Sequence, residues 1–134
     1  MRKLLFFLVL AFSIFSCSVD SKPESTEFLL PVESVEAPTS MYAGQTTTFQ
    51  VGYRRPTDCH IFNGFYNNSD GSAQIVAVRA LKFDQGNCMD DSENIYVVPY
   101  QFTPDVPGDY LFKFWKGNNE TGAPEYLEYE VIVE

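Results

Sequence analysis

The stretch Thr46–Arg54, TTTFQVGYR, decides the fold class. Its large side chains Phe49, Val51 and Tyr53 alternate with polar or small residues, which is the two-residue period of a strand with one buried face. The final segment, Glu125–Glu134, has the same period and predicts a second strand of this kind. Its expected inward side chains are Leu127, Tyr129, Val131 and Val133, with Glu128, Glu130 and Glu134 pointing outward.

Five further segments have the length and composition of strands and are separated by turn residues such as Gly, Pro, Asn and Asp. Downstream of the N-terminal apolar run, the sequence has no segment with the 3.6-residue period of a helix. Pro99 favours an edge position or a bulge for its strand, because proline cannot donate to a β-ladder. The sequence therefore predicts one all-β domain over residues 31–134, an antiparallel β-sandwich of about seven strands. The five segments are Leu30–Glu36, Cys59–Tyr66, Ala73–Phe83, Ile95–Thr103 and Asp109–Lys116.

The same period assigns side chains to faces. In Cys59–Tyr66 we expect Tyr66 on the face of His60 and Phe62, opposite Ile61 and Phe65. The polar cluster Asn67–Gly71, NNSDG, predicts the turn that ends this strand. In Asp109–Lys116 we expect Tyr110, Phe112 and Phe114 to share one face.

Pro107-Gly108-Asp109-Tyr110, followed by alternating apolar residues, resembles the start of the penultimate strand in extracellular immunoglobulin-like and fibronectin-like domains. The resemblance implies a corner at Gly108 and a hydrogen bond from the Tyr110 hydroxyl to the preceding backbone. The cysteines and Trp115 do not lie on the strands that carry them in antibody domains. The likeness is therefore one of architecture, an immunoglobulin-like β-sandwich.

The N-terminus has the order of a secretory signal. Arg2 and Lys3 are followed by Leu4–Phe15, which is apolar except for Ser13. This run of about twelve residues is too short to span a bilayer core as a helix. The chain is therefore expected to be exported.

The signal ends at Ile14-Phe15-Ser16-Cys17, which resembles the lipobox of bacterial lipoproteins. That resemblance implies lipidation of Cys17, palmitate included, and cleavage before it. The alternative is an ordinary signal cut after Ser18, for example, which would yield a soluble secreted protein. On the first interpretation residues 1–16 are a signal peptide and residues 17–30 a lipidated flexible tether. The expected location is then the bacterial cell envelope, at the outer membrane, with lipid on Cys17 as the membrane contact.

The chain has three cysteines, and lipidation of Cys17 would leave Cys59 and Cys88 as a pair. Exported chains meet an oxidising compartment, so the sequence predicts a disulfide between these two residues. The bond would close a loop of about 30 residues and stabilise the fold by about 3 kcal/mol. Two cysteines with the single His60 do not supply the four ligands of a structural zinc site.

Charge excludes one class of partner. Nine Lys and Arg stand against eighteen Asp and Glu, a net charge of −9, and loss of Arg2 and Lys3 with a signal peptide would make it more negative. Nucleic acid is not expected as a partner, because phosphate contacts need a basic surface. The acidic surface is also unsuited to anionic headgroups, so any membrane contact would come from lipid.

Two groups of residues are candidate sites of chemistry. Asp84, Asp90, Asp91 and Glu93 gather around one expected loop, which is either a calcium site or a solvated acidic loop, and their spacing matches no EF-hand. Cys59 and His60 are neighbours on an expected strand, where successive side chains point to opposite faces, so they do not form a Cys–His dyad. We therefore expect no catalytic residue, no metal, no cofactor and no enzyme activity.

Aromatic residues are abundant, and Tyr96, Tyr100 and Trp115 are either core residues or an exposed stripe. An exposed stripe would suit sugar rings or a protein interface. The expected function is that of a non-catalytic interaction or accessory module in the envelope, with a protein partner. The alternatives are a carbohydrate-binding module and a protease-inhibitor or immunity-type binding protein.

Overall fold

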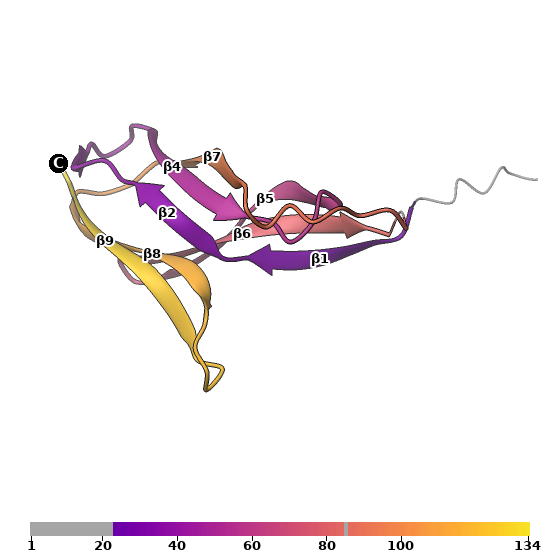
Figure 1. Cartoon of the computed structure of the whole chain (residues 1–134). Helices are drawn as coiled ribbons and strands as arrows, with labels where there is room; N and C mark the ends of the chain where they lie inside the picture. Colours follow the sequence, from indigo (N-terminus) through magenta and orange to yellow (C-terminus); the bar gives the residue numbers. More distant parts are fainter. Residues whose placement is uncertain (1–22, 85) are drawn as a thin grey trace, which may run out of the picture.

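In the computed structural model, which describes residues 23–84 and 86–134, the chain forms two packed β-sheets (Figure 1). The described residues form nine strands and no helix. The predicted all-β sandwich is therefore confirmed, with two strands more than expected. The strands are β1 (Ser25–Leu30), β2 (Val32–Glu36), β3 (Ser40–Met41), β4 (Thr47–Arg54), β5 (His60–Asp70), β6 (Ala73–Phe83), β7 (Ile95–Phe102), β8 (Gly108–Asn118) and β9 (Pro124–Val133).

The larger sheet contains six strands in the order β1-β6-β8-β9-β3, with β5 also paired to β6. The smaller sheet has the order β2-β4-β7, so β7 is an edge strand, the first of the two alternatives for Pro99. Two pairings, β6 with β8 and β3 with β9, are parallel, which corrects the expectation of a wholly antiparallel sandwich. Between β6 and β8 the chain crosses to the smaller sheet as β7 and returns, and this double crossing allows β8 to run parallel to β6.

The core lies between the two sheets and is centred on Phe49 of β4. Phe49 is fully buried, and its ring centroid lies 4.6 Å from that of Phe112 and 5.6 Å from that of Phe114, both on β8. The predicted inward face of β9 is also confirmed, since Val131 and Val133 are buried. Leu127 and Tyr129 pack against the same cluster. The alternation of β4, β8 and β9 therefore produces one continuous core.

The predicted tether extends too far toward the C-terminus. Ser25–Leu30 is strand β1, paired with β6 from Ser25 opposite Phe83 to Leu30 opposite Val78. The strand expected within residues 30–36 is observed as β2, and Pro31 separates it from β1 where the chain passes from the larger sheet to the smaller. The sequence of β1 is polar enough to suggest a tether, but the β6 ladder satisfies its backbone groups.

Strand β5 differs from its prediction in length and in register. It continues to Asp70, so only the end of the expected Asn67–Gly71 turn is a turn. The register shifts between Phe62 and Phe65, with Gly64 at a φ of +83°. This bulge inserts an extra residue and places Phe65 on the inner face with Phe62, their ring centroids 5.4 Å apart. Tyr66 consequently points to the outer face, opposite to the sequence expectation.

The corner before β8 agrees with the immunoglobulin-like resemblance. The Tyr110 hydroxyl donates to the Val106 carbonyl oxygen at 3.1 Å. Gly108 has a φ of +142°, which favours glycine over residues with a side chain. The four-residue motif therefore predicted both the corner and its hydrogen bond.

Candidate functional site

The larger sheet divides at the middle of β6. β8 pairs with Ala73–Val76 of β6, whereas β1 pairs with residues 78–83 along the same edge. Figure 1 shows the β8–β9 hairpin turning away from β1 where one partner replaces the other. A hollow lined by residues of β1, β5, β6, β8 and β9 lies on the sheet at this point.

Gly117 lies at a bend of β8, beyond the part of this strand that pairs with β6. The register of the β8–β9 pair shifts between Trp115 and Gly117, and Gly117 has a φ of +113°. A Cβ at this position would lie 3.8 Å from the Pro31 ring, which is ordinary packing distance. The backbone conformation, and not a lack of space, is what favours glycine here.

Three aromatic side chains from three strands meet in the resulting hollow, which we call the aromatic groove. Trp115 of β8 and Tyr126 of β9 are direct cross-strand partners, and Tyr66 of β5 is paired with Ala77 of β6. The groove has a volume of about 390 Å³ and a mostly apolar lining. Leu29, Ile75, Ala77 and Pro124 complete it.

Charged and polar side chains border the aromatic groove. On one side Lys113 lies 3.6 Å from Glu128 and 4.6 Å from the centre of the Tyr126 ring. On the other side Arg79 donates to Glu27 at 2.8 Å, and this hydrogen bond lowers the pKa of Glu27. The indole N–H of Trp115 donates to the side-chain oxygen of Asn118 at 3.0 Å. The groove thus combines an apolar floor with a rim of hydrogen-bonding groups.

Of the two alternatives for Tyr96, Tyr100 and Trp115, core residues or an exposed stripe, the stripe is not formed. Tyr100 is 5% exposed and lies in the core, where burial raises the pKa of its hydroxyl to about 12. Tyr96 lies in the smaller sheet within a polar cluster, and only Trp115 belongs to the aromatic groove. The signal for the other groove aromatics was weak, because Tyr66 and Tyr126 can be placed beside Trp115 only once the strand pairing is known.

The carboxylate of Asp91, in the acidic loop, belongs to a polar cluster at the end of β4. Arg55 donates to Asp91 and to the Tyr96 hydroxyl, and its guanidinium lies 4.4 Å from the centre of the Tyr96 ring. Hydrogen bonds from Tyr96, Asn94 and Arg55 lower the pKa of Asp91 to about 2. Asp91 is therefore ionised at neutral pH and neutralised by Arg55.

Two other carboxylates of the same loop, those of Asp90 and Asp84, have separate partners. Asp90 accepts from the Ser92 backbone and hydroxyl, and Asp84 lies 3.6 Å from Lys82. In the described parts of the chain no three carboxylates among Asp84, Asp90, Asp91 and Glu93 lie within 4.8 Å of one another. The loop geometry therefore gives no support to the calcium interpretation.

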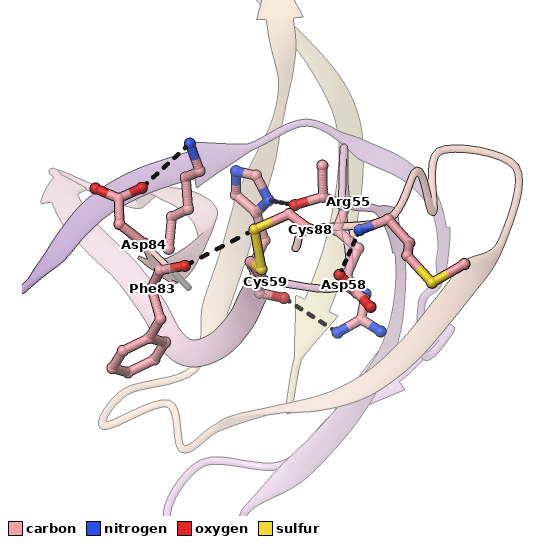
Figure 2. The surroundings of a disulfide bond; sticks show 10 residues. Arg55, Asp58, Cys59, Phe83, Asp84 and Cys88 are labelled. Carbon is pink, nitrogen blue, oxygen red and sulfur yellow. Dashed lines mark hydrogen bonds and ion pairs between the residues drawn. A yellow bond between two sulfur atoms is a disulfide. The ribbon is translucent and has the colours of Figure 1, made fainter. Parts of the chain in front are cut away.

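Cys59 and Cys88 form the expected disulfide, with Cα atoms 5.5 Å apart (Figure 2). Asp58 lies beside it and accepts a hydrogen bond from the Met89 backbone N–H at 2.9 Å. Asp58, Cys59 and Cys88 lie close enough together to share a metal ion. The sulfur atoms of a disulfide are not thiolates, however, so these three residues are not a metal site in the oxidised protein. His60 is buried, and its Nδ1 lies 2.9 Å from the Thr57 hydroxyl. His60 and the two cysteines therefore contact other parts of the fold and do not form a site with one another.

Cys17 and the signal sequence lie outside the described residues. Within residues 23–84 and 86–134 there is no helix of the length and apolar character needed to cross a membrane. Comparisons with protein-family models, curated proteins and solved structures found no match to the chain.

Proposed function

We propose that the protein is a lipid-anchored, non-catalytic binding module of the bacterial cell envelope, and that the aromatic groove is its binding surface. Lipid on Cys17 would hold the domain at the outer membrane. At most about 28 Å of extended chain separates Cys17 from the first residue of β1, so the domain would stay close to the headgroups. The bound molecule would lie against the outer face of the larger sheet.

The observation that carries the proposal is the convergence of Tyr66, Trp115 and Tyr126 in one solvent-open hollow. Large aromatic side chains normally bury their surface in the core, as Phe49 and Phe112 do here. In β5 the bulge turns Phe65 toward the core. The next residue, Tyr66, remains 45% exposed on the outer face. Concave apolar surfaces with a few polar groups at the border are typical of ligand sites.

In-cell photo-crosslinking tests the groove as a binding surface. The full chain would carry Tyr126→p-benzoylphenylalanine, with Tyr42→p-benzoylphenylalanine as the matched control, since Tyr42 is 50% exposed and lies outside the groove. We expect irradiation to yield a higher-mass adduct from position 126 and none from position 42. Absence of an adduct at position 126, with normal protein levels, would remove the groove as the binding surface.

Cys17→Ala is expected to release the protein from the membrane fraction. Without the thiol no thioether-linked lipid forms, and an acidic surface offers no electrostatic attraction to anionic headgroups. Fractionation and intact-mass measurement of both proteins provide the check. Membrane retention of the variant at the wild-type level, or a wild-type mass without acyl chains, would contradict the anchor.

A further inference from the structure

We infer that the ligand of the aromatic groove is a neutral glycan. This inference rests on the proposed function and names the chemical class that the groove would bind.

The size of the groove favours a small ligand over a protein surface. Its volume of about 390 Å³ lies in the usual range of small-molecule sites, roughly 300–1,000 Å³. A stable protein interface removes about 800 Å² of surface from each partner and places its apolar part at the centre. Here the ion pairs Lys113–Glu128 and Arg79–Glu27 bound the aromatic residues on both sides. Charged side chains therefore flank the groove, whereas the centre of such an interface is depleted of charge.

The chemistry of the groove matches the two-sided character of a sugar ring. A pyranose has an apolar face of C–H groups, which packs on the flat rings of Trp and Tyr. Its edge carries hydroxyls that both donate and accept. At the rim Lys113 can donate and Glu128 can accept, and Asn118 already accepts from the Trp115 indole. A wholly apolar ligand would instead remove water from these charged groups without replacing the hydrogen bonds, which is unfavourable.

Charge selects neutral sugars over acidic ones. The two rim cations Lys113 and Arg79 each face a carboxylate, Glu128 and Glu27, so neither offers an unpaired positive charge to a sugar carboxylate. The whole chain has a net charge of −9, which further opposes an anionic ligand. Uronic-acid polymers are therefore expected to bind more weakly than neutral glycans of the same length.

Titration with defined oligosaccharides tests the inference. The probes are tetrasaccharides of β-linked glucose, α-linked glucose, β-linked mannose and β-linked N-acetylglucosamine, with tetragalacturonate as the acidic comparison. Trp115 is the single tryptophan of the chain, so a change in its fluorescence reports on the groove directly. Calorimetry on the purified wild type, Tyr126→Ala, Tyr66→Ala and Tyr42→Ala then gives the affinities. Thermal melts confirm that each variant is folded, and Tyr66→Ala and Tyr126→Ala substitute for each other if one is not.

We expect at least one neutral tetrasaccharide to shift Trp115 fluorescence and to bind at least tenfold more weakly to Tyr126→Ala or Tyr66→Ala. Binding to Tyr42→Ala should equal that of the wild type. Failure of all four neutral probes, or equal affinity for the folded groove variants, would overturn the glycan inference. If the adduct at position 126 then contains a protein partner, the proposed binding function stands and only its ligand class is wrong. If that position also gives no adduct, both fail.

Discussion

Phe49→Ala is expected to lower the free energy of unfolding by about 3–5 kcal/mol, the usual range for a buried Phe→Ala change. Phe49 is fully buried, and its ring contacts Tyr100 of its own sheet and Phe112 and Phe114 of the opposite sheet. Removing the ring leaves a cavity between both sheets. These neighbours are themselves locked by strand pairing, so the cavity cannot collapse fully. Urea denaturation followed by circular dichroism measures the loss.

Val97→Ala is the matched control for this prediction. Val97 lies on β7, next to the strand of Phe49, but its side chain is 60% exposed. Its loss should change stability by no more than about 0.5 kcal/mol. A comparable loss for both variants would mean that Phe49 is not the centre of the core.

Alternation predicted the strands whose two faces have different environments. Phe49 and Val51 of β4 and Val131 of β9 are buried as expected, because a period of two leaves only one way to cover them. β6 was predicted with its observed bounds, Ala73–Phe83, although its middle is apolar on both faces. The structure explains that composition. Val76 and Val78 face the core, whereas Ile75 and Ala77 line the aromatic groove.

Strands β1 and β3 are not predicted from the sequence, because they depend on pairing with a neighbouring strand and not on a hydrophobic pattern of their own. β1 has only one buried residue, Leu30, and is defined by its ladder with β6. β3 consists of Ser40 and Met41 and exists through its parallel pairing with the end of β9. Neither pairing leaves a local hydrophobic period. Such strands can be identified only after the partner strand has been placed.

The candidate site depended on the same missing information. The sequence leaves Trp115 as either a core or an exposed aromatic, and its companions in the groove, Tyr66 of β5 and Tyr126 of β9, lie on other strands. Strict alternation predicts the wrong face for Tyr66, because the bulge near Gly64 shifts the alternation by one residue. Gly inside a strand pattern is a known sign of a bulge. The residue that moves Tyr66 into the site was therefore visible in the sequence, but its consequence was not.

The double variant Cys59→Ser/Cys88→Ser is expected to lose about 2–4 kcal/mol of stability. The disulfide joins residues 29 positions apart, and the open chain gains conformational freedom mainly in the unfolded state. The wild type in reductant should lose a similar amount, as measured by urea denaturation. The double variant provides the control, because its midpoint should not respond to reductant. A wild-type midpoint that is the same with and without reductant would contradict a stabilising disulfide.

The hydrogen bonds around the Cys59–Cys88 disulfide indicate whether its removal affects mainly the folded or the unfolded state. Asp58 exchanges two hydrogen bonds with Met89, and the Asp91 N–H donates to the Pro56 carbonyl oxygen. These contacts hold the two segments together without the sulfur atoms, so the folded structure should persist in the double variant. The unfolded chain, by contrast, becomes less compact and exposes more surface. We therefore expect the dependence of stability on urea concentration to become steeper in the variant, since that slope follows the surface exposed on unfolding. An unchanged slope would instead assign the loss to the folded state and to contacts made by the disulfide itself.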